Sequence, residues 1–395
     1  MLILNKILAV YVGPSGYAAI GQFQNVITIS LTAGGAAAGN GVVALTAAHP
    51  ENIAAQRAVW RTAFTLSFVA SGITALAILF LHKVIANAIF GSDAYAAPLL
   101  WFAGALVMFV ANSLLLSVLN GRKEIGRLVA ANIGGSILTL IATGALAYRF
   151  GLKGALIAVA VNQSLAFFFS LFLCARSGWF KLSDLIGPVD KAIARKLAGF
   201  AAMAVTSAIA APLGLIATRS YLGRQFGWEQ AGLWEAMLRI SGLQLMFLTT
   251  ILGTYYLPRM AEIRDRFETR GELFKVLRLA LPVSIAGTTI LYNFRERFIA
   301  LLFDDSFLPM AGLFGWQLIG DNIKIVAWSL SFILVARANT KAFIILEVAF
   351  SALSTLLAVL FSSTFGFAAV TMAHPVVYTL YLVAILAFLA RRKVI

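Results

Sequence analysis

The stretch "WFAGALVMFVANSLLLSVLNGR" (residues 101–122) is a long apolar run that ends at a basic residue. A helix of about 20 apolar residues crosses the roughly 30 Å hydrocarbon core of a bilayer, so this run predicts a transmembrane helix. The rest of the chain has the same character: 61% of its 395 residues are hydrophobic, 12% are charged, and the mean hydropathy is +0.90. Such a composition excludes a soluble protein and predicts an all-α integral membrane protein.

Apolar runs separated by charged or turn residues predict eleven complete membrane spans and one partial span. The complete spans are residues 18–46, 59–81, 96–119, 128–149, 153–175, 197–218, 231–257, 274–293, 309–336, 342–363 and 367–390. Residues 1–12 would extend only about 18 Å as a helix, so we interpret them as a first helix with a truncated start. The connections are short, which places the expected function within the membrane part.

The opening stretch has a counterpart in "WQLIGDNIKIVAWSLSFILVAR" (residues 316–337), which starts with the same Trp and ends with the same Arg. The same offset relates Leu119 to Leu334, Phe150-Gly151 to Phe365-Gly366, and Ala175-Arg176 to Ala390-Arg391. A repeat of six helices keeps both halves in the same orientation, related by an axis along the membrane normal. The sequence predicts two parallel six-helix bundles with pseudo-two-fold symmetry, residues 1–175 and 197–395, joined by a cytoplasmic loop at 176–196.

Lys and Arg residues concentrate in alternate connections, such as residues 122–127 and 191–196. These connections are predicted to be cytoplasmic, together with both termini. The formal net charge of +15 is therefore largely a feature of topology. Because the basic residues are spread over many short loops and form no single module, a nucleic-acid partner is not expected.

Motifs for catalysis or for a cofactor are not found in the sequence. There is no GxxxxGK[ST] loop, so ATP is not expected to be the direct energy source. His49, His82 and His374 show no metal-ligand spacing, and the single Cys174 is interpreted as a packing residue. The Gly-rich stretch "GGAAAGNG" (34–41) lies within a predicted span, where small residues favour close helix packing. A transporter without enzymatic activity, cofactor or metal is predicted.

Two charged residues interrupt the predicted span 309–336. Asp321 and Lys324 share one helix face with Gln317 and Trp328, because the four positions follow the helical period. Asp321 lies about 18 Å from the start of the span, near the bilayer midplane. A structural ion pair that fixes the helix to a neighbour is one interpretation. The other is a functional site, because ionisable groups inside membranes are costly and usually face a cavity.

Other polar positions are candidates for the same cavity. Glu235 and Arg239 form a second charged pair at i and i+4, and Glu347 is a further acidic position. The first half contributes uncharged groups on one face of the span 18–46, which are Gln22, Asn25, Thr32 and Asn40. The predicted cavity has cations on one side and amides on the other. This suits an anionic headgroup that carries hydroxyl-rich sugars.

Four stretches resemble a known family: "LNKILAVYVGPSGYAAIGQFQNVITIS" (4–30), "WEQAGLWEAMLRISG" (228–242), "YYLPRMAEI" (255–263) and "LFGWQLIGDNIKIVAWSLSFILVARANTKAFIILEV" (313–348). The chain resembles, over nearly its whole length, the Wzx-type polysaccharide and O-antigen flippases of the MOP exporter superfamily. The resemblance implies a twelve-helix, MATE-like protein of the bacterial inner membrane that works by alternating access without ATP. The implied substrate is an undecaprenyl-pyrophosphate-linked oligosaccharide, of lipid III or O-antigen type, moved from the cytoplasmic to the periplasmic leaflet.

The resemblance also implies roles for the candidate residues. In this family cationic cavity residues are expected to meet the pyrophosphate, which points here to Arg239 and Lys324, with Asp321 balancing Lys324. The candidates for ion coupling are Asp321, Glu235 and Glu347. The family pattern implies a basic residue where this chain has Gln24 and another near Ala44. We therefore expect Gln24 to belong to a less positive cavity surface in the first half.

Alternative functions remain open at this point. A cation-coupled multidrug exporter of the same superfamily would need acidic residues to dominate the cavity, whereas the acidic and basic candidates are nearly balanced. A membrane glycan polymerase or ligase would be expected to have a large periplasmic loop. A scaffold protein predicts that the cavity charges can be neutralised without loss. The sequence predicts a functional monomer, and leaves open whether a polymerase and a chain-length regulator act beside it.

Overall fold

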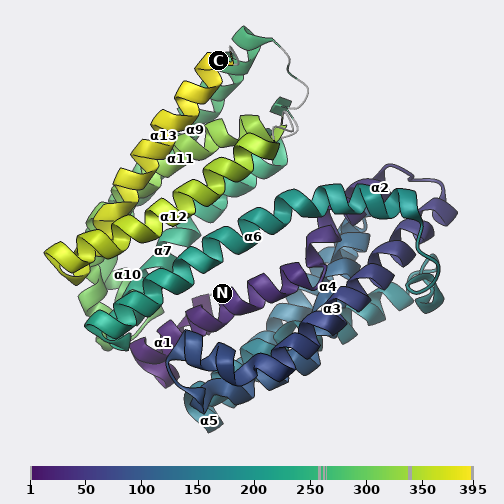
Figure 1. Cartoon of the computed structure of the whole chain (residues 1–395), viewed down its shortest axis with the longest axis horizontal. Helices are drawn as coiled ribbons and strands as arrows, with labels where there is room; N and C mark the ends of the chain where they lie inside the picture. Colours follow the sequence, from purple (N-terminus) through teal and green to yellow (C-terminus); the bar gives the residue numbers. More distant parts are fainter. Residues whose placement is uncertain (1, 257–258, 261–262, 264, 337–339, 393–395) are drawn as a thin grey trace. The chain divides into compact units, whose positions relative to one another are not determined.

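The computed structural model describes residues 2–256, 259–260, 263, 265–336 and 340–392 (Figure 1). The described residues are almost entirely helical and include no β-strand, which confirms the predicted all-α class. Seven of their helices are long and apolar enough to cross a membrane, and a bent pair would make eight. The protein is therefore a multi-pass membrane protein.

The chain folds into two compact units. One unit is Met1–Val12 with Ala19–Pro212, and the other is Gly13–Ala18 with Leu213–Ile395. The division at Pro212 falls inside the continuous helix α6 (Lys191–Phe226), whereas the sequence analysis placed it in the loop 176–196. The organisation into two six-helix bundles stays a prediction.

The helices of the first unit are divided differently from the predicted spans, and the predicted partial span 1–12 continues into the next span across a kink at Gly13. Its elements are α1 (Leu2–Ala33) apart from Gly13–Ala18, α2 (Gly39–Ala47), α3 (Ile53–Phe90), α4 (Ala96–Gly121), α5 (Ile125–Ala175) and the part of α6 up to Pro212. The predicted spans 128–149 and 153–175 lie in the single helix α5, which is kinked at Gly151. The predicted span 18–46 is broken into α1 and α2.

The break between α1 and α2 lies within the stretch 34–41 and divides the predicted span 18–46. Its small residues do permit close packing, because Gly35 and Gly39 approach Ser67 on α3 and Ser117 on α4. The span is not continuous, however, since the helical segments Asn5–Ala33 and Ala36–Ala47 are bent by 66°. Gly35 adopts a φ of 100° at the bend, a conformation that residues with a Cβ rarely adopt. The glycines of this stretch thus serve both close packing and the bend, because glycine adopts positive φ at little cost.

The second unit contains α7 (Trp228–Ile251), α9 (Arg266–Asn293), α10 (Arg295–Leu302), α11 (Phe314–Ala336), α12 (Thr340–Phe365) and α13 (Ala373–Arg391). A π-helical turn, Leu252–Tyr256, follows α7, and 3₁₀ segments at Asp305–Leu313 and Phe367–Met372 precede α11 and α13. The predicted spans 309–336 and 367–390 therefore each begin with a tighter 3₁₀ segment and continue as an α-helix.

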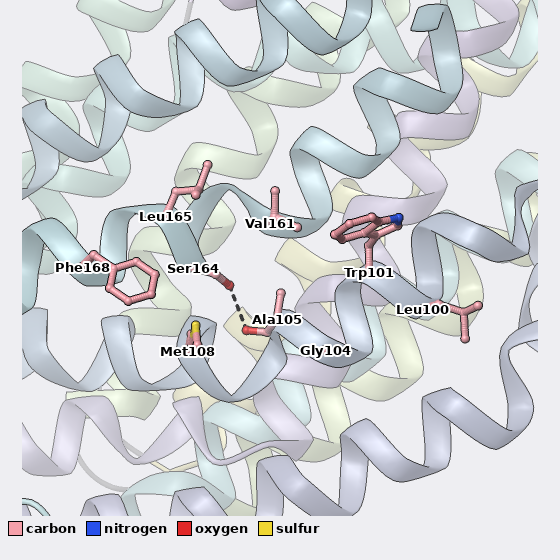
Figure 2. A pocket seen from close by; sticks show the side chains of 9 residues that line it. All are labelled: Leu100, Trp101, Gly104, Ala105, Met108, Val161, Ser164, Leu165 and Phe168. Carbon is pink, nitrogen blue, oxygen red and sulfur yellow. Dashed lines mark hydrogen bonds between the residues drawn. The ribbon is translucent and has the colours of Figure 1, made fainter.

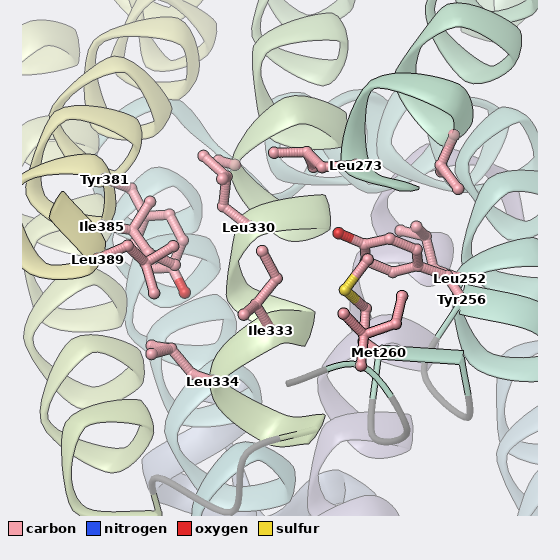
Figure 3. Packing of buried hydrophobic residues seen from close by; sticks show 13 residues of the cluster. Leu252, Tyr256, Met260, Leu273, Leu330, Ile333, Leu334, Tyr381, Ile385 and Leu389 are labelled. Atoms are coloured by element: carbon pink, nitrogen blue, oxygen red, sulfur yellow. The ribbon is translucent and has the colours of Figure 1, made fainter. Parts of the chain in front are cut away.

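A hydrophobic core of the second unit joins α9, α11, α13 and the π-helical turn (Figure 3). Tyr256, Ile333 and Ile385 are completely buried there. Tyr381 is also buried, and its hydroxyl donates a hydrogen bond of 3.0 Å to Ser331 Oγ, so its polar atom is satisfied. This packing holds α11 against α13. It thereby brings together the polar side chains that lie closer to the N-terminal ends of these two helices.

The sequence repeat is visible in the backbone. The ends of α4 and α11, and likewise the starts of α5 and α12, are 215 residues apart. Gly151 and Gly366, at the same offset, both have positive φ, 56° and 85°. Gly13 and Gly227, at an offset of 214, have φ of 65° and 96°. Because glycine reaches positive φ without steric cost, the two halves interrupt their helices at equivalent positions.

Candidate functional site

Asp321 is completely buried on α11 and is held by groups from three helices. Ser241 Oγ on α7 donates a 2.6 Å hydrogen bond to Asp321 Oδ2, and Gln317 Nε2 donates one of 3.2 Å to Oδ1. His374 Nε2, at the start of α13, lies 2.9 Å from Asp321 Oδ1. We call these four residues the Asp321 cluster. A buried carboxylate needs such partners, because desolvation disfavours its charged form.

A glycine makes room for the imidazole in the Asp321 cluster. A Cβ built on Gly320 would lie 2.3 Å from His374 Cδ2 and 2.8 Å from the backbone nitrogen of Pro375. Glycine at this position therefore permits α13 to approach α11 closely enough for His374 to reach Asp321. His374 lacks metal-ligand spacing in the sequence, so it was not predicted as a site residue. Its place inside the predicted span 367–390 was the signal that could have identified it.

Lys324 contacts aromatic side chains and does not contact Asp321. Its Nζ lies 4.3 Å from the centre of the Trp328 ring and 5.1 Å from that of Tyr378, as expected for cation–π contacts. Among the described residues no carboxylate lies within ion-pair distance of Nζ, although Glu347 on α12 interacts with it electrostatically at longer range. Asp321 is in contact with His374, and Lys324 interacts with Asp321 electrostatically without an ion-pair contact.

A second charged cluster contains Glu235, Arg239, Arg219 and Tyr17, which we call the Glu235 cluster. Arg239 Nε lies 3.0 Å from Glu235 Oε1, so the predicted i, i+4 pair is formed. Arg219 on α6 pairs with the other carboxylate oxygen and is itself only 1% exposed. The Arg239 guanidinium lies 4.6 Å above the Tyr17 ring. Two guanidiniums thus share one carboxylate, and 19% of the Arg239 side chain stays exposed.

Arg219 was missed because the predicted span 197–218 ended one residue before it. Helix α6 instead continues to Phe226, so Arg219 lies inside the helix and not in a loop. The apolar side chain of Leu222, which is completely buried, follows it one turn later. An apolar residue one turn beyond Arg219 indicates in the sequence that the helix continues past the arginine.

The uncharged candidates of the first unit occupy different environments. Gln22 is completely buried, and its Nε2 donates a 3.4 Å hydrogen bond to the Ile89 carbonyl, so it joins α1 to α3. Gln24 is half-buried, and its backbone carbonyl accepts a hydrogen bond from the Thr28 hydroxyl. Asn25 is half-buried and its Nδ2 has no hydrogen-bond partner. Asn40 is exposed and lines a polar cleft of about 330 Å³ at the break between α1 and α2.

An apolar groove of about 600 Å³ lies between α4 and the second half of α5 (Figure 2). Gly104 and Ala105 leave space on α4, and the rings of Trp101 and Phe168 border it. The hydroxyl of Ser164 donates a 2.8 Å hydrogen bond to the Ala105 carbonyl and is therefore not available to a ligand as a donor. The groove suits hydrocarbon chains and offers no charged group to a phosphate.

No group of three or more His, Cys, Asp and Glu residues that could hold a metal ion occurs in the described part of the chain. The described candidates instead offer cations, a buried carboxylate–imidazole pair and hydroxyl-lined surfaces. Chemically, this set can bind an anion, exchange a proton and hydrogen-bond uncharged polar groups.

Comparison with known proteins places these features in a family. The chain is 28% identical to the lipid III flippases of Escherichia coli (strain K12) and Shigella flexneri over 348 residues, which cover 88% of this chain and 83% of each relative. An inward-facing MATE transporter of the MOP superfamily has a TM-score of 0.81 at 15% identity, covering 99% of this chain and 93% of the transporter. The lipid II flippase MurJ has a TM-score of 0.73 at 15% identity, covering 98% and 84%.

The structural neighbours confirm the predicted MOP fold, and the curated relatives confirm the resemblance to polysaccharide flippases. The family described as polysaccharide biosynthesis protein matches residues 24–312, which is well over half of the chain. This match includes the break between α1 and α2, the charged residues Arg219, Glu235 and Arg239, and the whole of α9. The chain therefore belongs to the polysaccharide biosynthesis protein family.

Proposed function

We propose that this protein is a flippase that moves an undecaprenyl-pyrophosphate-linked oligosaccharide, of lipid III or O-antigen type, from the cytoplasmic to the periplasmic leaflet. The observation that carries the proposal is Lys324, a membrane-embedded cation that rests on aromatic rings, in a chain similar to lipid III flippases over most of its length. Placing a cation there is costly, and a phosphate ligand would supply an anion in direct contact with it. In this proposal the transport is not driven by ATP and includes no covalent step.

Arg239 is the second proposed phosphate contact. Its guanidinium is bonded on one side by Glu235 and stacked on Tyr17, which restricts its rotamers. A planar, preorganised guanidinium can bind phosphate through two parallel hydrogen bonds. In this proposal Glu235 positions Arg239, and its two ion pairs make it a weaker candidate for ion coupling than Asp321.

The proposed setting is the bacterial inner membrane, with both termini in the cytoplasm. The concentration of Lys and Arg in alternate connections supports this orientation. We propose that the protein acts as a monomer on a substrate whose lipid tail stays in the bilayer. A polymerase and a chain-length regulator are proposed as partners that act on the glycan after translocation.

The central test is complementation of a bacterial strain that lacks its own lipid III flippase, scored by surface glycan. We expect the parent protein to restore the glycan and the double variant Asp321→Ala, Lys324→Ala to fail. The matched control is Glu229→Ala, which removes an exposed acidic residue in the first turn of α7. No rescue by the parent protein at normal membrane expression would contradict the proposal, and drug-efflux assays would then test the multidrug exporter alternative.

Asp321 and His374 are proposed to couple transport to protons. A carboxylate and an imidazole 2.9 Å apart can share and exchange one proton, and Lys324 on the same helix adds a nearby positive charge. We expect Asp321→Asn, which keeps the shape but cannot ionise, to make flipping in proteoliposomes independent of an imposed proton gradient. Glu347→Gln is the comparison variant. If Glu347→Gln removes the gradient dependence and Asp321→Asn does not, the coupling assignment is wrong.

A further inference from the structure

The break between α1 and α2 is built into the packing of the first unit. A Cβ on Gly35 would lie 2.6 Å from Ser67 Oγ on α3, and a Cβ on Gly39 would lie 2.8 Å from Ser117 Oγ on α4. Ser67 and Ser117 therefore approach the backbone of the bend more closely than a residue with a Cβ would allow at Gly35 or Gly39. A helix interrupted in this way leaves backbone groups without helical partners. Within a membrane such groups are tolerated where they line a cavity or are buried in protein.

The second unit has an irregularity at the equivalent place. Helix α7 changes to a π-helical turn at Leu252–Tyr256. At the repeat offset of 214 that relates Gly13 to Gly227, this turn corresponds to residues 38–42, where α2 begins. π-Helical turns are frequent at functional sites. Interrupted spans at corresponding positions of two repeats are also the best sequence-level indication of a transporter's binding site.

The polar cleft at the break is lined by hydroxyls and an amide and by no charged residue. Its polar lining residues are Thr28, Thr32, Asn40, Ser113 and Ser117. The remaining lining residues are small or apolar and come from α1, α2, α6 and the segment between α1 and α2. Its volume of about 330 Å³ limits it to a small part of a large headgroup. This lining suits an uncharged ligand that is rich in hydrogen-bonding groups.

The hydrogen bonds within the cleft indicate which groups of a ligand it can accept. The hydroxyls of Thr28, Thr32 and Ser117 donate to backbone carbonyls of their own helices, at 2.9, 2.8 and 2.9 Å. Each of these oxygens then presents lone pairs, so the cleft is rich in acceptors. A sugar hydroxyl can donate to them, whereas a deprotonated phosphate can only accept.

We propose that this cleft is a subsite for the hydroxyl groups of uncharged sugars in the headgroup. The inference rests on the proposed function, because it concerns which part of the lipid-linked oligosaccharide is recognised here. Asn40 acts as both donor and acceptor to a sugar, and the hydroxyls act as acceptors. In this proposal the cleft recognises the glycan part of the substrate.

The test measures binding of two probes to the full chain in detergent: undecaprenyl pyrophosphate carrying the oligosaccharide, and undecaprenyl pyrophosphate alone. For the double variant Asn40→Leu, Ser117→Ala we expect roughly tenfold weaker binding of the glycosylated probe, as for the loss of one or two hydrogen bonds. Binding of the unglycosylated probe should stay unchanged. Asn132→Leu is the matched control, since Asn132 is an exposed amide on α5 that bonds its own helix.

The outcomes separate this inference from the proposed function. Equal loss for both probes, or no loss for either, would overturn the sugar subsite. A parent protein that binds both probes equally would also overturn it and leave the flippase proposal standing. A parent protein that binds neither probe would contradict the proposed function itself. Should the double variant melt at a lower temperature than the parent, the isosteric variants Thr28→Val and Thr32→Val provide the same comparison without a change of shape.

Discussion

Glu235→Ala is expected to lower the free energy of unfolding by about 3–5 kcal/mol, because it leaves buried guanidiniums without their carboxylate. Arg219 is 1% exposed and Arg239 is largely buried, so neither can reach water fully when the shared partner is removed. The measurement is the melting temperature of the purified protein in detergent, together with the amount of folded protein in the membrane. We expect a strong fall in both.

The control for this prediction is on the same helix. Glu229→Ala removes an exposed acidic residue from the first turn of α7, where only a helix-dipole interaction of roughly 0.3–1 kcal/mol is lost. Glu235→Gln should fall between the two variants, because the amide oxygen still accepts one hydrogen bond. An unchanged melting temperature for Glu235→Ala would show that the Glu235 cluster does not hold α6 and α7 together.

Lys324→Met is expected to reduce the rate of flipping by roughly 10- to 100-fold, the effect of losing one charged hydrogen bond worth about 1.5–3 kcal/mol. The fold should persist, because the Lys324 ammonium has aromatic partners, and a methionine side chain can keep the contacts with Trp328 and Tyr378. The measurement is translocation of a fluorescent lipid-linked oligosaccharide in proteoliposomes, normalised to the amount of folded protein.

Two comparisons make this prediction specific. Lys324→Arg keeps the charge and should retain a substantial part of the rate. Lys153→Met removes an exposed lysine from α5 and should leave the rate unchanged. If Lys324→Met transports normally, the pyrophosphate is neutralised elsewhere, and Arg239 becomes the remaining candidate for that role.

Much of the fold could be predicted from local patterns. The apolar runs identified the helices because a membrane span needs a fixed length of apolar chain, whatever its neighbours are. The offset between "WFAGALVMFVANSLLLSVLNGR" and its counterpart at 316–337 anticipated the matching ends of α4 and α11. Asp321 and Glu235 were identified as candidates because a charge inside such a run is costly wherever the helix is placed.

The partners of those charges depended on the tertiary structure. Helical spacing brings Lys324 close to Asp321 along the chain, yet the carboxylate is bound by Ser241 from α7 and His374 from α13. By helical spacing Gln22 shares a face with Asn40. Its side chain is nevertheless buried in the first unit and donates a hydrogen bond to the Ile89 carbonyl. Periodicity determines which residues share a helix face. It does not determine which helix or side chain packs against that face.

By itself, then, the sequence determined the class of the protein, the approximate extent of its helices, its repeat and the cost of its buried charges. These are properties of a single helix in a bilayer, set by length, period and desolvation. Only the tertiary structure decided that Asp321 pairs with His374, that Arg219 completes the Glu235 cluster, and that the chain bends at Gly35. Each of these depends on how closely two helices approach, and that distance is set by glycines such as Gly320 and Gly39, together with the side chains that fill the remaining space.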